Sequence, residues 1–245
     1  MNAVAMKPNW TTADDMAELA VLDVADCQRA LAAIDALRAS WTQRHPMLPF
    51  FTLGAASYID AARSRDGYKA AATAGNPLIE SRFGWLLECV RSSLESTLGA
   101  PVAWNPDAAL PGFHIYLAHK MFEQPIASIH CDSQYELVDW TRCGTPDFTR
   151  AASFTLALAL PRHGGGLNVW DVNRSDITGL DNVGIGARIR AAKMSYHSYS
   201  TGTMVLHSGN VMHQAAPGRD ISPEERRITL QGHCQRVGDR WFAYW

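Results

Sequence analysis

Residues 126–140 read IASIHCDSQYELVDW, and His130 and Asp132 stand where the apolar, strand-like part of this stretch ends. Side chains two residues apart on a strand point to the same side, so both could face one metal ion if the strand end opens into a cavity. A histidine and an aspartate at this spacing also occur by chance in many chains. A metal site therefore needs a third ligand from elsewhere in the sequence.

The chain around this stretch predicts a mainly β core. From Val102 onward, short β-branched and aromatic runs alternate with Gly and Pro. We predict eight strands, at residues 112–118, 126–132, 153–161, 166–171, 194–199, 202–209, 212–218 and 226–234. Eight such strands indicate a cupin-like jelly roll, which is two facing antiparallel sheets. Residues 171–193, rich in Gly and charge, are read as a long loop, either a lid or a solvated excursion.

The first hundred residues favour helix instead. Apolar residues recur at helical spacing over residues 23–41 and again over residues 76–99, which open with Asn76-Pro77 and close at Gly99. We expect residues 1–100 to form a helical region that packs on one sheet of a jelly-roll core at residues 101–245. The two parts would make one structural domain.

Composition excludes several classes of function. The chain has 245 residues, 47% of them hydrophobic, and a formal net charge of −2 without long runs of like charge. Nucleic acid and membrane surfaces are therefore not expected partners. Five cysteines without a C-x-x-C pair suggest no disulfide framework and no structural zinc site. With no apolar signal-peptide core in residues 1–16 and no membrane span, we expect a cytoplasmic protein.

The missing metal ligand is found downstream, in GTMVLHSGNVMHQAAPG, residues 202–218. His213 follows a turn and begins a predicted strand, whereas His207 lies inside an apolar run and is read as a packed histidine that does not bind the metal. Two histidines and one carboxylate on one face of an ion are the ligand set of non-haem iron(II) oxygenases. His130, Asp132 and His213 are the predicted metal ligands and catalytic centre.

A second polar feature follows in RRITLQGHC, residues 226–234. Alternation places Arg227, Thr229, Gln231 and His233 on one face of this strand. An arginine can hold a carboxylate by two parallel hydrogen bonds, and a threonine hydroxyl can add a third. Taken alone, the pattern also fits an exposed edge strand.

Together these elements resemble the iron(II)/2-oxoglutarate-dependent dioxygenase superfamily. The resemblance rests on H-x-D at residues 130–132, the strand and turn that lead to His213, and R-x-T at residues 227–229, and it covers about half of the chain. It implies a double-stranded β-helix with iron(II) on the two histidines and the aspartate. It also implies that Arg227 and Thr229 bind the distal carboxylate of 2-oxoglutarate, and that O2 is the second co-substrate.

The implied reaction is hydroxylation of an unactivated C–H bond, with release of succinate and CO2. Related halogenases lack the acidic ligand, so the presence of Asp132 argues against halogenation. Desaturation, ring closure and epoxidation use the same ligands and stay open.

The substrate is less well indicated. His114 and Tyr116 alternate with apolar residues and should face the cavity, where Tyr116 either helps to bind the oxo acid or fills the interior. Further candidates for the cavity wall are Gln134, Tyr135, Trp170 and His233. By elimination we expect a small polar metabolite, such as an amino acid or a natural-product intermediate. The aromatic tail RWFAYW should pack on the protein body or across a homodimer.

Two other classes of protein remain as alternatives. A cupin-like metalloenzyme that does not use 2-oxoglutarate would share the jelly roll and the histidines but would have no need of Arg227 and Thr229. A non-catalytic jelly-roll protein could keep the metal for structure alone.

Overall fold

The computed structural model describes residues 8–245, so residues 1–7 of the stretch read for a signal peptide lie outside the described residues. Within that range, no helix is both long and apolar enough to cross a membrane. The helices are α1 (Val24–Ala36), α2 (Ser57–Arg63), α3 (Arg65–Leu98), α4 (Arg174–Ile177), α5 (Asn182–Ala191) and the short 3-10 helices η1 (Arg38–Ser40), η2 (Lys120–Glu123) and η3 (Gln134–Glu136).

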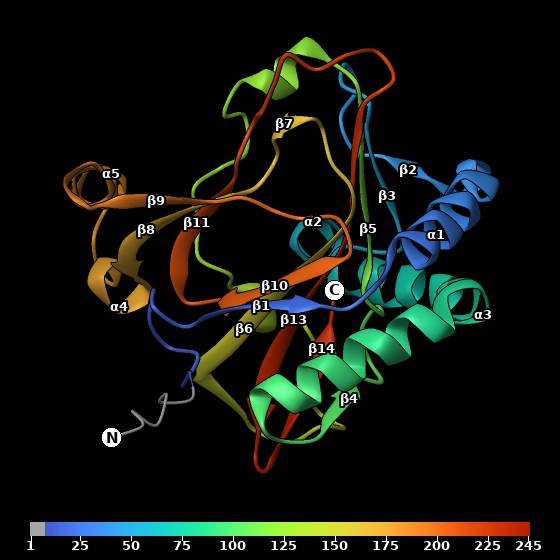
Figure 1. Ribbon diagram of the computed structural model, residues 1–245. Helices are drawn as coiled ribbons and strands as arrows, with labels where there is room; N and C mark the ends of the chain where they lie inside the picture. The colour runs from blue at the N-terminus through green and yellow to red at the C-terminus, as the bar shows by residue number, and fades with distance from the viewer. Residues whose placement is uncertain (1–7) are drawn as a thin grey trace, which may run out of the picture.

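Strands make up most of the remaining regular structure (Figure 1). They are β1 (Met16–Ala20), β2 (Thr42–Gln43), β3 (Phe50–Leu53), β4 (Val102–Trp104), β5 (Gly112–Leu117), β6 (Pro146–Ala159), β7 (His163–Gly164), β8 (Leu167–Asn173), β9 (Met194–His197), β10 (Thr203–Ser208), β11 (Val211–Ala215), β12 (Gly218–Arg219), β13 (Arg226–Val237) and β14 (Arg240–Tyr244).

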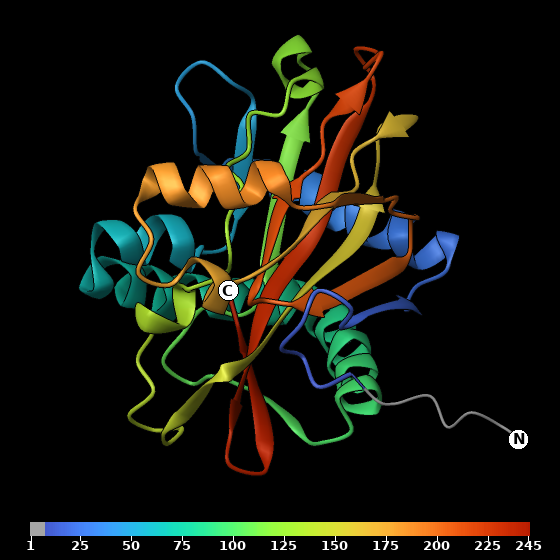
Figure 2. The same cartoon turned by 90° about the vertical axis from the view of Figure 1, so that its left-hand side faces the viewer.

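These strands form two sheets that face one another and one short pair. The main sheet has nine strands, with the order β1-β10-β6-β13-β5-β3-β2; β14 also pairs with β13, and β4 pairs with β14. The second sheet has the order β11-β8-β9, and β12 pairs with β7. Side chains from both larger sheets line one cavity, so the sheets enclose the interior of a jelly roll. Figure 2 shows β13 running the length of this body.

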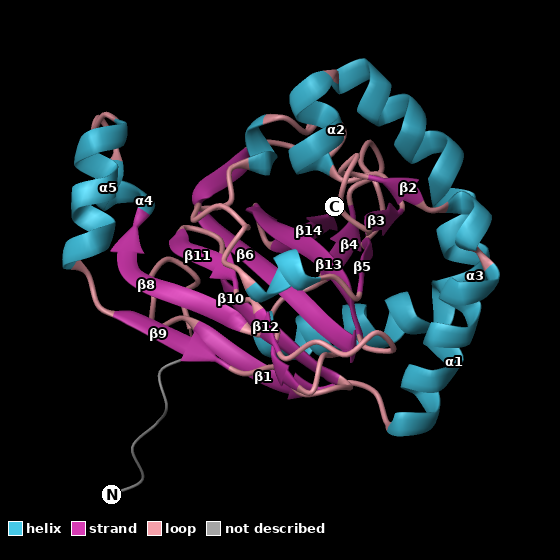
Figure 3. Cartoon of the chain, turned by 90° about the horizontal axis from the view of Figure 1, so that it is seen from above, coloured by secondary structure: helices cyan, strands magenta, loops and turns pink. Residues whose placement is uncertain are grey.

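Helices α1 and α3 cover the outer face of the main sheet, as the sequence predicted. Figure 3 shows them together on one side of the molecule, with α5 beyond the second sheet on the opposite side. The shared core is formed by buried side chains at helical spacing and by alternate side chains of the central strands, including Ala30, Ile34, Phe83, Leu86, Val90, Phe113, Ile115, Phe154, Leu156, Ile228 and Leu230. Because one face of the sheet is filled in this way, the polar residues of the same strands face the cavity.

Helix α3 begins earlier than the sequence predicted and carries Pro77 in its interior. Ser64 caps its first turn by accepting a hydrogen bond from the backbone of Gly67. The added turns are held by Tyr68, whose hydroxyl donates to the Trp245 carbonyl at 2.5 Å and accepts from the Ala109 backbone at 2.9 Å. An interior proline removes one helical hydrogen bond and crowds the preceding turn, yet α3 continues through Pro77.

Two predicted segments were wrong. Residues 126–132 are not a strand: only His130 forms an isolated bridge there, and Ile126 is exposed. With no packed apolar face and one bridging contact, the segment stays irregular. Residues 171–193 are not a plain loop, because they contain the end of β8 and helices α4 and α5. Asn173 and Asp176 form a capping box at α4, and Asp181 caps α5, so local polar side chains start both helices.

The N-terminal region also contributes strands that periodicity did not reveal. β1 pairs with β10, and β3 pairs with β5, so both extend the main sheet. The division of the chain near residue 100 stays a prediction. The aromatic tail packs on the protein body, where Trp241, Tyr244 and Trp245 are buried.

The tail generates a test of the packing at Gly112. A Cβ atom at Gly112 would lie 2.1 Å from a Trp245 ring atom and 2.8 Å from the Leu53 carbonyl oxygen. We therefore expect Gly112→Ala to lower the free energy of unfolding by about 1–3 kcal/mol. Gly84→Ala, within α3, meets no neighbouring atom within 4 Å and should raise it by about 0.5–1 kcal/mol. Urea unfolding of both variants measures the difference, and equal midpoints would contradict the tight contact.

Candidate metal centre

The backbone holds His130 and His213 side by side. The His130 amide donates to the His213 carbonyl at 3.0 Å, and the His213 amide donates back at 2.9 Å. Two residues on, the Asp132 amide donates to the Gly209 carbonyl at 2.8 Å. These three bonds attach the irregular segment to β11 and to the turn before it.

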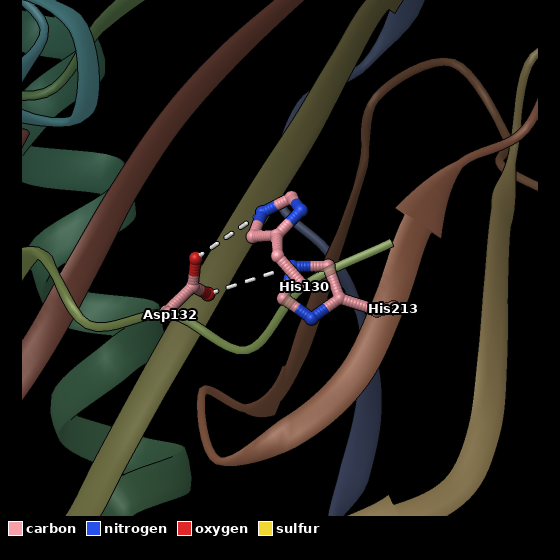
Figure 4. Close-up of side chains that lie close together, drawn as sticks. All are labelled: His130, Asp132 and His213. Carbon is pink, nitrogen blue, oxygen red and sulfur yellow. Dashed lines mark ion pairs between the residues drawn. The ribbon is translucent and has the colours of Figure 1, made fainter. Parts of the chain in front are cut away.

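The three side chains converge on one point. One ligand atom from each of His130, Asp132 and His213 lies within 4.8 Å of the others. Nε2 of His130 is 3.7 Å from Asp132 Oδ1, and Nε2 of His213 is 3.6 Å from Asp132 Oδ2, as the dashed lines of Figure 4 mark. Asp132 and His213 are buried, and His130 is half-buried. This spacing leaves room for a metal ion among the three.

Hydrogen bonds set the orientation of both imidazoles. Nδ1 of His130 lies 3.0 Å from the Ser128 carbonyl, and Nδ1 of His213 lies 2.9 Å from the Val211 carbonyl. A carbonyl can only accept, so each Nδ1 carries the hydrogen and each Nε2 keeps its lone pair. Both Nε2 atoms face Asp132. This arrangement is the usual one for histidines that bind a metal.

The charges suit a divalent cation. Burial lowers the pKa of His213 to about 3, against the attraction of Asp132. Burial acts to raise the pKa of Asp132, but the imidazoles of His213 and His233 outweigh it and hold that pKa well below its usual range. The site therefore offers a carboxylate and neutral imidazole at physiological pH, as metal binding requires.

His207, the rival to His213, lies next to the site but outside the group of donors. It is buried, its ring centroid is 4.6 Å from that of His213, and its Nδ1 bonds the Ser208 carbonyl at 3.0 Å. Burial lowers its pKa. Its position matches the predicted packed histidine.

The cavity beside the three donors also contains Arg227. Its volume is about 500 Å³, and its wall includes His130, Asp132, His213 and Arg227. The Arg227 Nε donates to the Gly165 carbonyl at 3.0 Å, and no carboxylate among residues 8–245 pairs with this guanidinium. It lies between two aromatic rings, 5.6 Å from the centroid of Tyr116 and 5.8 Å from that of Tyr199. The remaining N–H groups are free to bind an anion.

Arg226 points the other way, as strand alternation requires. Its guanidinium pairs with Asp35 of α1 at 2.7 Å, on the helix-covered face of the sheet. The register of β13 at its start is therefore the predicted one.

Thr229 differs from the expectation. It is fully buried and is not part of the cavity wall, and its hydroxyl accepts a hydrogen bond from Gln231 at 3.3 Å. A bulge between Ile228 and Thr229 shifts the pairing of β13 with β6 at this point. The extra residue of this bulge lies on β6, between Ala157 and Ala159, and β13 pairs with β5 without a shift, so Thr229 stays on the side of the strand that carries Arg227 and Gln231.

The other candidate residues divide between the cavity and the surrounding structure. Tyr116 and His114 line the cavity, as do Gln134 and His233, whereas Tyr135 and Trp170 are not part of its wall. Tyr116 stacks on Phe50 with ring centroids 4.3 Å apart, and burial raises its pKa.

Sequence reasoning missed several polar residues of the wall, among them Tyr58, Ser153, Thr155 and Tyr199. Tyr58 lies 2.7 Å from Nε2 of His114, and Ser153 bonds Asp132. The alternation of Ser153 and Thr155 with apolar residues was the one available signal for Ser153. Tyr58 comes from a helix that the sequence did not indicate.

No protein-family model and no curated protein matches the chain. Solved structures do match it. An N-substituted L-amino acid dioxygenase from Burkholderia ambifaria AMMD has 14% identity and a TM-score of 0.57, covering 95% of this chain and 87% of that one. A non-heme alpha-ketoglutarate-dependent carbocyclase from nogalamycin biosynthesis has 12% identity and a TM-score of 0.54, covering 93% and 83%. A non-heme alpha-ketoglutarate-dependent epimerase, also from nogalamycin biosynthesis, has 12% identity and a TM-score of 0.51. That match covers 92% of this chain and 81% of the epimerase.

At these identities the matches show the fold. The chain has the double-stranded β-helix of enzymes that depend on 2-oxoglutarate, also called alpha-ketoglutarate. The jelly-roll fold that the resemblance implied is confirmed.

The donor geometry predicts how histidine variants bind metal. His130→Ala or His213→Ala should weaken the affinity for Co²⁺ by more than about a hundredfold, beyond the range typical of residues that only support a ligand. His207→Ala should change that affinity by less than about tenfold and should mainly lower the free energy of unfolding, because His207 is buried. Titration of the metal-free variants with Co²⁺ measures the affinities. Selective loss of binding in His207→Ala would contradict the assignment.

Proposed function

We propose that this protein is an iron(II)- and 2-oxoglutarate-dependent oxygenase that hydroxylates a C–H bond of a small polar metabolite. The observation that carries the proposal is one cavity that contains both a His-Asp-His donor group and an arginine that pairs with no carboxylate of the described residues 8–245. The fold shared with an amino acid dioxygenase and with two alpha-ketoglutarate-dependent enzymes supports it.

The donor set supports iron(II) as the metal. Two imidazole nitrogens and one carboxylate oxygen on one side of an ion leave the opposite positions open for other ligands. In the proposal these donors are His130, His213 and Asp132. When bound, iron(II) together with 2-oxoglutarate and O2 supplies the oxidation: one oxygen atom enters the substrate and the other enters succinate, as CO2 is released.

Arg227 is the proposed anchor for the distal carboxylate of 2-oxoglutarate. Its contact with the Gly165 carbonyl leaves hydrogen-bond donors available, and the rings of Tyr116 and Tyr199 hold the guanidinium in place. A planar guanidinium between aromatic rings is well oriented for a two-point contact with a carboxylate. We assign Tyr116 to the same carboxylate pocket. The Thr229 hydroxyl accepts from Gln231 and keeps its own hydrogen, which could be donated to the same carboxylate.

The size of the cavity supports a small substrate. A volume of about 500 Å³ lies within the range of sites for small molecules, and both polar and apolar side chains line it. An amino acid or a natural-product intermediate fits this description. Hydroxylation is the outcome we propose. Ring closure and epimerisation are the other outcomes to test, because a carbocyclase and an epimerase are among the proteins with a similar fold.

Neither alternative, a cupin-like metalloenzyme or a non-catalytic metal protein, explains why Arg227 faces the cavity. Among residues 8–245 no carboxylate pairs with the half-buried Arg227 guanidinium, which faces the cavity and suits an anionic ligand. Neither alternative requires such an anion.

Conversion of 2-oxoglutarate to succinate is the deciding experiment. Iron(II)-loaded protein is incubated with 2-oxoglutarate, O2 and a panel of small polar metabolites, and succinate and product masses are followed together. Hydroxylation adds about 16 mass units, the mass of one oxygen atom retained from O2. Product formation without succinate would favour the cupin-like alternative, and metal binding without O2 consumption would favour the non-catalytic one.

The co-substrate assignment predicts a contrast between adjacent arginines. Arg227→Ala should weaken 2-oxoglutarate binding by roughly 2–5 kcal/mol, or about thirty-fold to several-thousand-fold, and Arg227→Lys should rescue it poorly. Arg226→Ala is the matched control, because Arg226 pairs with Asp35 on the opposite face of the sheet. Affinities come from anaerobic titration of the iron(II) protein, which follows the metal-to-ligand absorption band. A larger effect at Arg226 would disprove the assignment of Arg227.

A further inference from the structure

Ser153 and His233 stand behind the Asp132 carboxylate on two adjacent strands. They are paired residues in the ladder between β6 and β13. The Ser153 hydroxyl is hydrogen-bonded to Asp132 Oδ2 and lies 3.0 Å from Nδ1 of His233. That Nδ1 is itself 3.6 Å from Asp132 Oδ2. The three side chains form a continuous line from β13 through β6 to the metal centre.

The direction of the hydrogens in this line follows from valence. An ionised carboxylate only accepts, so Ser153 must donate its single hydrogen to Asp132. The Ser153 oxygen then has only lone pairs left for His233, so Nδ1 of His233 must donate to it. With its hydrogen engaged in this way, Nδ1 has no lone pair for a metal. His233 accordingly lies beside the metal centre without belonging to the donor group.

Asp132 needs support of this kind because of where it stands in the chain. Its segment is irregular, and its backbone is tied down by one hydrogen bond to Gly209. The side chain is 4% exposed, so water cannot hold the carboxylate in place. Ser153 and His233, by contrast, belong to the two most extensively paired strands of the main sheet. Gln134 reaches the other carboxylate oxygen, Oδ1, at 3.1 Å, but it begins the short helix η3 two residues after Asp132 and does not belong to the main sheet.

We propose that Ser153 and His233 are positioning residues that fix the Asp132 carboxylate for metal binding, with His233 acting through the Ser153 hydroxyl. This inference rests on the proposed function insofar as Asp132 binds a metal. The main sheet, which carries Ser153 and His233, would then hold the Asp132 carboxylate in place, although Asp132 itself belongs to an irregular segment.

The test uses Co²⁺ as the probe, titrated into the metal-free, full-length protein. Ser153→Ala and His233→Leu should each weaken Co²⁺ affinity by about tenfold to a hundredfold, the range found when support for a ligand is removed. The double variant should be no weaker than Ser153→Ala alone, because His233 acts only through that hydroxyl. His233→Asn should restore much of the affinity, because its amide nitrogen can replace Nδ1 as a donor.

Two readouts separate positioning from a general loss of structure. The visible ligand-field bands of bound Co²⁺ should shift in Ser153→Ala and His233→Leu, whereas circular dichroism of the metal-free variants should match the wild type. Thr155→Val is the matched control, since Thr155 carries a buried hydroxyl on the same strand and lines the same cavity but makes no hydrogen bond to Asp132. Its Co²⁺ affinity and spectrum should stay at the wild-type values.

Several results would overturn the proposal. Unchanged Co²⁺ affinity in Ser153→Ala, or additive losses in the double variant, would show that the line of hydrogen bonds does not act on the metal. Complete loss in His233→Leu with normal binding in Ser153→Ala would make His233 a ligand. If the wild type binds Co²⁺ but 2-oxoglutarate does not perturb its spectrum, the proposed function fails while the positioning role stands. Failure of the wild type to bind Co²⁺ would overturn both.

Discussion

The pair of backbone hydrogen bonds between His130 and His213 is the contact on which the rest of the site depends. Residues 126–132 lack the packing of a strand, and this bridge holds His130 against β11, together with the Gln214 side chain, which donates to the Ala127 carbonyl at 2.6 Å. Because the bridge pairs the two residues directly, it brings together two imidazoles that are far apart in the chain. The Asp132 amide then bonds the Gly209 carbonyl, which directs the carboxylate toward both rings. A ligand set for one ion is the geometric consequence.

The strands of the main sheet have one face in the apolar core and the other toward the cavity, which leaves room for these polar groups. Helices α1 and α3 fill the outer face of the main sheet with apolar side chains, so the alternate residues of the same strands can face the cavity. Arg226 and Arg227 show the division at adjacent positions: one pairs with Asp35 of α1, and the other lines the cavity between two tyrosine rings. A buried carboxylate such as Asp132 is tolerated because Ser153, Gln134 and the imidazoles satisfy it. The charge of Asp132 is therefore compensated by its immediate neighbours.

Much of the fold could be predicted because its signals are local. The helical spacing of Ala30 and Ile34 marked α1, and the alternation of residues 226–234 marked β13. The prediction failed where the structure depends on distant partners. The early turns of α3 are held by contacts of Tyr68 with Trp245 and Ala109, and β1 is a strand because it pairs with β10. Neither partner can be recognised from the local sequence.

By itself, the sequence determined which residue types were available at which spacing: H-x-D, a histidine after a turn, and adjacent arginines on a strand whose alternation separates them. These follow from short-range geometry, since a strand places every second side chain on the same side. The tertiary structure alone decided that the H-x-D segment is irregular, that Thr229 is buried outside the cavity wall, and that Ser153 links His233 to Asp132. The physical reason is that strand pairing and close packing join residues many positions apart. Those contacts depend on the whole arrangement of sheets, which no local pattern contains.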